Sequence, residues 1–273
     1  MNRQFSLAHF TLFGCPPPEL ARTASHAGYD FIGLRVIPID RPGEPRYQLA
    51  EDHKLRRETK RALAETGVKL LDIELAQISE RLDPRAYLPT LEAAADLGAR
   101  FLLTAAWTPD RAVVIDRFAA LCELARPLDI TVVLEFMSFS DVATLAQAVD
   151  VVQTAGVDNA GILVDTLHCH SAGTPLEDLG AIPPEWLHYA HVCDAVADVP
   201  ETREGRLRIA REQRLFPGEG GIDVAGIVKR LPPNIVYALE VPNPERVKAL
   251  GAEEYARQCL AASRQYLQEA GCI

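Results

Sequence analysis

One local pattern recurs along the chain and constrains its fold more than any other feature: a helix-like stretch ends at a glycine, and a short apolar run begins a few residues later. It occurs in SHAGYDFIGLRV, AETGVKLLDIEL, ADLGARFLLTA and QTAGVDNAGILVD. We expect each glycine to follow the last helical residue, where a positive φ is needed. These glycines are Gly28, Gly67, Gly98 and Gly156.

Their spacing indicates a repeat of about 30 to 40 residues, the size of one strand–helix unit. The longest gap, from Gly98 to Gly156, has room for two units. Its extra helix is predicted in DRFAALCELARPLDI, ended by Pro127 instead of a glycine.

The apolar runs bounded in this way number eight, with a helical period in almost every gap. Alternating strands and helices predict a parallel sheet with right-handed crossovers, and eight units predict an α/β fold closed into a (β/α)8 TIM barrel. An open doubly wound sheet is disfavoured, because the first strand–helix turn has neither GxGxxG nor GxxxxGK[ST]. The strands are expected at 5–9, 31–36, 69–75, 100–105, 130–136, 161–166, 188–193 and 235–241.

The length and amino-acid composition agree with one domain over residues 1–273. The chain is 48% hydrophobic and contains no low-complexity linker. Its formal net charge of -10 argues against nucleic acid or a membrane surface as a partner, since both need a basic field. A small-molecule substrate is expected, and a homo-oligomer stays an open alternative.

The cysteines and the N-terminus indicate a reduced, cytoplasmic protein. The six cysteines are scattered without a CxxC pair. The N-terminal stretch MNRQFSLAHFTLFG is interrupted by His9 and followed by PPP, so a signal peptide is the weaker interpretation, and no transmembrane span is predicted.

Polar residues close the apolar runs, at the barrel end where chemistry is built. They are His9, Arg35, Glu74, Trp107, Glu135, Asp165, His191 and Glu240. The last four follow consecutive strands and would form an oxygen-rich site with one imidazole. This mixture suits Mn²⁺, Mg²⁺ or Co²⁺ and can hold Zn²⁺ or Fe²⁺.

Electrostatic cost supports a metal ion at these four positions. Three carboxylates after buried strands repel one another unless a cation neutralises them. The alternative is that each acid separately pairs with an arginine or caps the next helix.

With DTLH (165–168) and PGEGGID (217–223), these strand ends make the chain similar to the xylose-isomerase-like barrel superfamily of sugar phosphate isomerases and epimerases. This superfamily also contains keto-sugar 3-epimerases, inosose dehydratases, 3-dehydroshikimate dehydratases and abasic-site endonucleases. The resemblance covers the whole chain and is strongest over 130–241. It implies the fold and the metal site, but not the substrate.

The resemblance also implies residue roles. Glu135, Asp165, His191 and Glu240 would bind one divalent metal ion, and Glu135 and Glu240 would move the proton on opposite faces of the substrate. His168 would contact substrate oxygens or, alternatively, hydrogen-bond a ligand from outside.

Such a site supports proton abstraction next to a carbonyl. Reprotonation on the other face gives epimerisation, reprotonation on the neighbouring carbon gives isomerisation, and loss of a β-hydroxyl gives dehydration. An isomerase or epimerase of a small hydroxy-keto compound is the leading hypothesis. A dehydratase of a cyclic oxo-acid or ketocyclitol is the alternative.

The remaining strand ends are weaker substrate-binding candidates. Arg35 would bind a substrate carboxylate or phosphate, or form a salt bridge with Glu74. Trp107 would wall the pocket or pack its rim, and His9 would contact substrate or hydrogen-bond within the rim.

Residues 194–216 form a long loop on the active face, which is a candidate lid. Arg211 and Arg214 are predicted to share one helical face just before the PGEG turn, so that one of them grips an anionic substrate. The default interpretation of this arginine-rich run is a solvated helix face.

Two further classes of function can be distinguished from a metal-dependent isomerase by their metal content and surface charge. A DNA-repair endonuclease would need several metals and a basic groove, and a silent binding protein would hold no metal. Cys193 is expected to be a small buried residue, and Cys169 and His170 are assigned no role.

Overall fold

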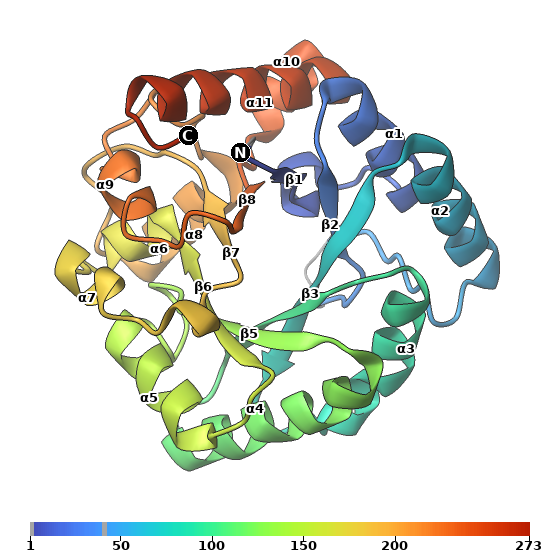
Figure 1. Cartoon of the computed structure of the whole chain (residues 1–273), viewed down its shortest axis with the longest axis vertical. Helices are drawn as coiled ribbons and strands as arrows, with labels where there is room; N and C mark the ends of the chain where they lie inside the picture. Colours follow the sequence, from blue (N-terminus) through green and yellow to red (C-terminus); the bar gives the residue numbers. More distant parts are fainter. Residues whose placement is uncertain (1–2, 40–42) are drawn as a thin grey trace.

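Eight parallel strands close into a barrel in chain order, with helices around it, in a computed structural model that describes residues 3–39 and 43–273 (Figure 1). The predicted (β/α)8 barrel is confirmed, and each predicted strand overlaps an observed one. The strands are β1 Phe5–Leu7, β2 Phe31–Arg35, β3 Lys69–Ile78, β4 Phe101–Ala106, β5 Thr131–Glu135, β6 Ala160–Asp165, β7 Tyr189–Val192 and β8 Val236–Leu239.

The predicted strands differ from the observed ones mainly at their ends. β1 stops at Leu7, because the chain turns into the 3-10 helix η1 (His9–Leu12). β3 continues three residues past the predicted end, to Ile78, and pairs there with the end of β4.

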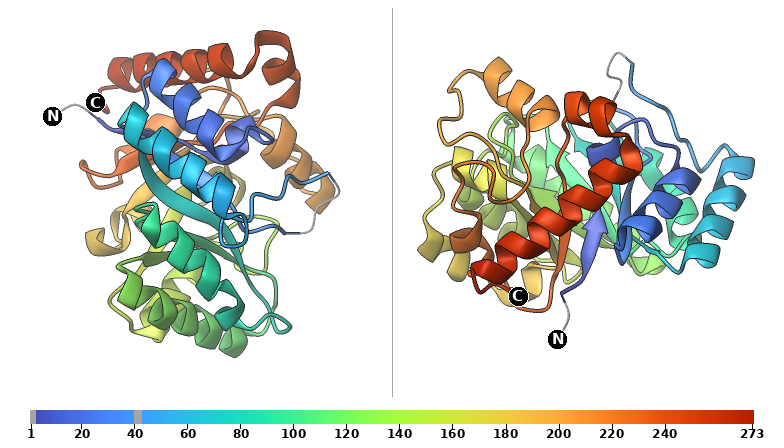
Figure 2. Two further views of the ribbon diagram at one scale, coloured as in Figure 1. Left: turned by 90° about the vertical axis from the view of Figure 1, so that its right-hand side faces the viewer. Right: turned by 90° about the horizontal axis from the view of Figure 1, so that it is seen from above.

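Helices cover the outside of the barrel on all sides (Figures 1 and 2). The four predicted glycines all have positive φ, between 62° and 93°, and follow α1, α2, α3 and α5. The α-helices are α1 Pro17–Ala27, α2 His53–Thr66, α3 Leu88–Asp96, α4 Arg111–Ala125, α5 Leu145–Ala155, α6 Thr166–Ser171, α7 Leu176–Gly180, α8 Arg203–Glu212, α9 Val224–Val228, α10 Pro244–Leu250 and α11 Ala252–Glu269; the short 3-10 helices are η2 Pro84–Tyr87, η3 Arg126–Leu128 and η4 Pro184–Trp186.

The helix predicted in the long gap begins earlier than expected. α4 starts at Arg111, where the Asp110 side chain accepts hydrogen bonds from the amides of Ala112 and Val113. It ends before Pro127, as predicted.

The apolar side chains form two cores, which explains why the strands are nearly continuous apolar runs. One core lies between the sheet and the helices, and the other fills the barrel interior. The interior core includes Phe31, Leu71, Phe101, Leu103, Val133, Leu163, Tyr189 and Val236. Within the described residues, none of the helices combines the length and apolar character needed to cross a membrane.

The interior core leaves polar side chains to gather where the strands end. α8 lies over this mouth of the barrel, and its residues Ala210 and Arg211 line the cavity there (Figure 2). The fold therefore concentrates the predicted functional residues in one place.

Candidate metal centre

Four side chains from consecutive strands converge at the mouth of the barrel. Glu135 ends β5, Asp165 ends β6, His191 lies in β7 and Glu240 follows β8, and all four are buried. His191 Nδ1 lies 3.6 Å from Glu135 Oε1, 3.8 Å from Asp165 Oδ2 and 3.6 Å from Glu240 Oε2. The structure thus brings together the four residues predicted to bind a metal ion.

Two atoms of this cluster lack a partner. Glu135 Oε1 and His191 Nδ1 are buried and accept or donate no hydrogen bond within the described part of the chain. A buried polar atom without a hydrogen-bond partner is costly. Two such atoms that face each other therefore indicate a ligand that binds both. An imidazole nitrogen and carboxylate oxygens are ligand types that divalent metal ions accept.

The electrostatics of the cluster favour a positive charge at its centre. Burial alone would lower the pKa of the His191 imidazole, but the carboxylates of Glu240 and Glu135 outweigh burial and raise this pKa to about 10. Burial raises the pKa of the Glu135 carboxyl to about 7. A bound divalent cation would supply the positive charge and leave His191 neutral.

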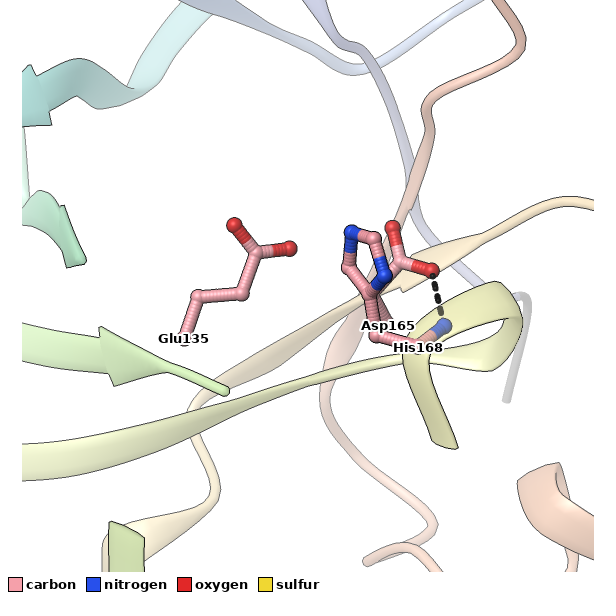
Figure 3. Close-up of side chains that lie close together, drawn as sticks. All are labelled: Glu135, Asp165 and His168. Atoms are coloured by element: carbon pink, nitrogen blue, oxygen red, sulfur yellow. Dashed lines mark hydrogen bonds between the residues drawn. The ribbon is translucent and has the colours of Figure 1, made fainter. Parts of the chain in front are cut away.

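Asp165 is fixed from two sides. Its Oδ1 accepts the amides of Leu167 (2.7 Å) and His168 (3.2 Å), so it caps α6; Figure 3 shows the bond from His168. Its Oδ2 faces His191 and Arg214. Burial raises the pKa of this carboxyl, but the guanidinium of Arg214 and the imidazoles of His168 and His191 together outweigh burial and lower the pKa to about 2. Asp165 both caps a helix and pairs with an arginine, and these contacts leave it directed at the cluster.

Arg214 joins two of the four residues. Its Nη1 lies 2.5 Å from Asp165 Oδ2, its Nη2 lies 2.7 Å from Glu240 Oε2, and its Nε donates to the Ala210 carbonyl at 2.9 Å. The prediction that Arg214 shares a helical face with Arg211 is wrong, because α8 ends at Glu212. Arg214 instead follows the helix and reaches inward, where it is 2% exposed.

A buried aspartate that the sequence reasoning missed holds the segment after Arg214 in place. The Asp194 carboxylate accepts the amides of Ala195 (2.8 Å) and, at 3.0 Å each, Gly218, Gly220 and Ile222. A side chain at Gly220 would come within 2.1 Å of the Ala195 carbonyl oxygen, which explains the glycine there. The PGEGG turn is thereby tied to the end of β7.

The His168 imidazole lies beside the carboxyl groups of Glu135 and Asp165 (Figure 3). Burial lowers its pKa to about 4. Its Nδ1 has no hydrogen-bond partner among the described residues, and its ring packs edge-on against Phe139 at 5.1 Å. Only its backbone amide bonds Asp165, so the side chain remains available to a ligand.

A cavity opens above the cluster and contains most of the predicted substrate residues. His9 is the exception and does not line it. The lining residues are Phe10, Arg35, Ile39, Glu74, Leu75, Trp107, Glu135, Met137, Phe139, His168, Ala210, Arg211, Arg214 and Glu240. Met137 and Phe139 were not predicted from the sequence, since they lie in the turn after β5.

Both ring nitrogens of His9 bond the protein backbone. Nδ1 accepts the Arg35 amide at 2.9 Å, so Nε2 carries the proton and donates to the Cys15 carbonyl at 2.7 Å. The ring also stacks on Tyr47, with centroids 5.4 Å apart. This geometry agrees with the alternative of a rim histidine and gives no support to contact with substrate.

Arg35 forms the predicted ion pair with Glu74 and a second one that the sequence did not indicate. Its Nη1 lies 3.3 Å from Glu74 Oε2, and its Nε lies 3.1 Å from Glu44 Oε1. A substrate anion would have to compete with two carboxylates for this guanidinium.

An aromatic wall faces the cluster. The Trp107 ring stacks against Phe139 with centroids 6.3 Å apart. The indole Nε1 is buried and lacks a hydrogen-bond acceptor in the described part of the chain. Trp107 therefore offers one unused donor.

The long loop predicted at 194–216 contains α8, which is tied down across the mouth. Arg206 Nη1 donates to the Ser138 carbonyl at 2.9 Å, and Arg203 Nε donates to the Phe139 carbonyl at 3.3 Å. Two arginines of the arginine-rich run thus bond the turn after β5 as well as facing solvent.

Cys193, Cys169 and His170 were assigned no role in the site, and their surroundings agree with this. Cys193 and Cys169 are buried, and burial raises the pKa of each to about 12. His170 Nε2 bonds the Ala197 carbonyl at 2.8 Å.

Comparisons with known proteins agree with this geometry. The family model described as "Xylose isomerase-like TIM barrel" matches residues 21–266. A solved structure of the protein IolI with a bound zinc atom has a TM-score of 0.77 and 20% identity, covering 98% of this chain and 97% of that one. This likeness shows the fold.

Among curated relatives, the inosose isomerase of Bacillus licheniformis is 32% identical over 152 residues, which are 54% of this chain and 52% of the relative. That match spans about half of the relative's length. The inosose isomerase of Bacillus velezensis is 25% identical over 247 residues, 83% of each chain. The 3-dehydroshikimate dehydratase of Pseudomonas aeruginosa is 25% identical over 238 residues, 82% of this chain and 35% of the relative.

Proposed function

We propose that this chain, which belongs to the xylose isomerase-like TIM barrel family, is a divalent-metal-dependent isomerase or epimerase of a small hydroxyketone. A cyclic polyol ketone of the inosose class is the proposed substrate. The observation that carries the proposal is the placement of His191 Nδ1 within 3.8 Å of three carboxylate oxygens, two of them from residues that line the cavity, Glu135 and Glu240.

The residues present fit a divalent cation. Glu135, Asp165, His191 and Glu240 would hold it, and the unpartnered Glu135 Oε1 and His191 Nδ1 are atoms that it would satisfy. When bound, the cation supplies a Lewis acid that polarises a carbonyl or hydroxyl of the substrate. The oxygen-rich donor set suits Mn²⁺, Co²⁺, Mg²⁺ or Zn²⁺.

The chain's own residues would move the proton and orient the substrate. Glu135 and Glu240 lie on β5 and after β8, so they approach a ligand from two sides, and each can take a proton from a carbon next to the carbonyl. His168 would hydrogen-bond a substrate oxygen through its unpartnered Nδ1, and the indole Nε1 of Trp107 would donate to another.

Two of the three arginines that line the cavity, Arg35 and Arg214, favour a neutral substrate over an anionic one. Arg35 and Arg214 each already contact two carboxylates. Neither guanidinium is therefore positioned to neutralise a substrate phosphate without breaking an ion pair. A polyol ketone would need only hydrogen-bond partners, which His168 and Trp107 provide.

Proton nuclear magnetic resonance in D₂O tests the proposal. The metal-loaded chain would be incubated with inososes, ketoses, sugar phosphates and 3-dehydroshikimate. We expect exchange of the proton next to the carbonyl of an inosose, accompanied by isomerised or epimerised product. Absence of exchange and product with every compound, with each of the four metals, would refute the proposal.

A dehydratase is the second candidate, supported by the relative from Pseudomonas aeruginosa. The same first step, proton removal next to a carbonyl, would then be followed by loss of a β-hydroxyl. Appearance of a dehydrated product in the same spectra would favour this reaction.

A further inference from the structure

A second group of buried charges lies on the β2–β3 side of the cavity, away from the metal cluster. Arg35 and Glu74 are paired residues of neighbouring strands, and Glu44 reaches the same guanidinium from the segment after β2. The side chains of Arg35, Glu44 and Glu74 are 7%, 3% and 3% exposed. One guanidinium therefore contacts two buried carboxyl groups.

The two carboxyl groups are held unequally. Glu44 uses both oxygens, since Oε1 lies 3.1 Å from Arg35 Nε and Oε2 accepts the Ile39 amide at 2.9 Å. Glu74 has a single contact with Arg35, at 3.3 Å, and its side chain lines the cavity. A hydrogen-bonded ion pair stabilises the charged form of a carboxyl group, and Glu74 has only one such contact, at the long end of the range.

The surroundings of Glu74 strengthen this asymmetry. Burial, and then the carboxylates of Glu240 and Glu135, raise the pKa of Glu74 to about 7, although the Arg35 guanidinium opposes them. A carboxyl group of this kind donates a hydrogen bond when protonated and accepts one when ionised, and it can do both near neutral pH.

We propose that Glu74 is a further catalytic residue, which transfers a proton between the two oxygens of the bound hydroxyketone. This inference rests on the proposed function and assigns a task that the metal-site glutamates leave undone. Glu135 or Glu240 moves the proton between the two carbons, whereas isomerisation also requires a proton to leave the hydroxyl oxygen and another to reach the carbonyl oxygen.

The step balances without any further reactant. The glutamate base removes the proton from the hydroxyl-bearing carbon, and the C–H electron pair becomes the new C=C bond while the carbonyl π pair moves to oxygen. Glu74 gives its proton to that oxygen and takes the proton of the other hydroxyl, whose O–H pair forms the new C=O bond. The C=C pair then takes a proton at the former carbonyl carbon, so one carbon is oxidised and its neighbour is reduced.

Glu74 is placed for this task by the strand order. It projects from β3, while Glu135 ends β5 and Glu240 follows β8, so the three carboxyl groups line the cavity from three different sides. Glu74 contacts none of the four proposed metal ligands in the described structure through a hydrogen bond or ion pair. Its carboxyl group can therefore act on oxygen while the others act on carbon.

Comparing Glu74→Gln with Glu44→Gln in D₂O tests the proposal. Glutamine keeps the size of the side chain and one donor, but it cannot transfer a proton. We expect Glu74→Gln to lower net conversion of the hydroxyketone about 100-fold, while exchange of the carbon proton stays within about threefold of wild type. Glu44→Gln should retain conversion to within about tenfold, because Glu44 does not line the cavity.

Conversion by Glu74→Gln at the wild-type rate would overturn the inference, as would equal losses of conversion and carbon exchange. A second readout needs no substrate: the infrared band of protonated carboxyl groups in the metal-loaded protein at neutral pH. Glu74→Gln should reduce this band and Glu44→Gln should not, and an unchanged band in Glu74→Gln would also refute the assignment. Absence of exchange and conversion in the wild-type chain would instead refute the proposed function, and this inference with it.

Discussion

The two sides of the cavity use the same motif for different purposes. On the β5–β8 side, Arg214 lies between Asp165 and Glu240, and on the β2–β3 side, Arg35 lies between Glu44 and Glu74. In both places a buried guanidinium bridges two carboxyl groups.

The difference lies in what surrounds each bridge. The β5–β8 side adds Glu135 and His191, whose facing atoms have no partner in the described chain, so that side needs a further cation. Among the described residues of the β2–β3 side, the side chains of Arg35, Glu44 and Glu74 have no such unsatisfied atoms. Buried charge is therefore common to both sides, whereas unsatisfied polar atoms that face one another distinguish the side where we propose the metal site.

The largest expected effect comes from removing a proposed metal ligand and base. Glu240→Gln should lower turnover of the hydroxyketone about 1000-fold, because glutamine can neither accept the proton nor supply a negative ligand. It should also weaken metal binding at least about tenfold in calorimetric titrations. Glu245→Gln is the matched control, since Glu245 is an exposed residue at the start of α10. A fully active Glu240→Gln variant would remove Glu240 from the site.

Replacing Arg214 or Arg35 by methionine tests whether the two arginine–carboxyl bridges respond differently to a metal ion. Arg214→Met and Arg35→Met each remove a guanidinium that bridges two buried carboxyl groups, and each should lower the free energy of unfolding of the metal-free protein by about 3–5 kcal/mol. Added Mn²⁺ should restore much of the loss in Arg214→Met, since the cation replaces the missing charge, and little of it in Arg35→Met. Thermal unfolding with and without Mn²⁺ measures this. Equal recovery in both variants would contradict the distinction between the two sides.

The affinity of the site for a divalent metal ion should increase with pH. The pKa of His191 is raised to about 10 and that of Glu135 to about 7 before metal binds, so at pH 7 His191 carries a proton and Glu135 is partly protonated, and the cation must displace these protons. Affinity should therefore rise about tenfold per pH unit for each proton released, as pH increases from 6 to 8. Calorimetry in buffers of different ionisation enthalpy counts the released protons. A pH-independent affinity would show that neither group binds the metal.

The smallest expected effect concerns the aromatic wall, which neither bridge includes. Trp107→Phe removes only the indole N–H and keeps an aromatic ring against Phe139. We expect KM to rise about fivefold, equivalent to one hydrogen bond of about 1 kcal/mol, with metal affinity unchanged. Steady-state kinetics and the same calorimetric titration would check both values, and an unchanged KM would exclude a hydrogen bond from Trp107 to substrate.

The fold was predictable because its determinants are local. A strand covered on both faces is a short apolar run, and the glycine after a helix marks where the next run begins, as at Gly67 before β3. The grouping of Glu135, Asp165, His191 and Glu240 followed from topology, since all parallel strands of a closed barrel end at one mouth.

The bridges were less predictable because they depend on long side chains and irregular segments. Glu44 lies in a stretch without helical or strand periodicity, so nothing in the sequence indicates that it reaches Arg35. Arg214 was expected on a helix, but α8 ends two residues earlier. Asp194 bonds four backbone amides, and such a role has no distinguishing pattern in the sequence.

Anomalous X-ray scattering from crystals soaked in Mn²⁺ would locate the proposed metal ion. We predict one strong peak per chain, within bonding distance of His191 Nδ1 and of carboxylate oxygens from Glu135, Asp165 and Glu240. No peak among these four residues, or a stronger peak between Glu44 and Glu74, would contradict this prediction.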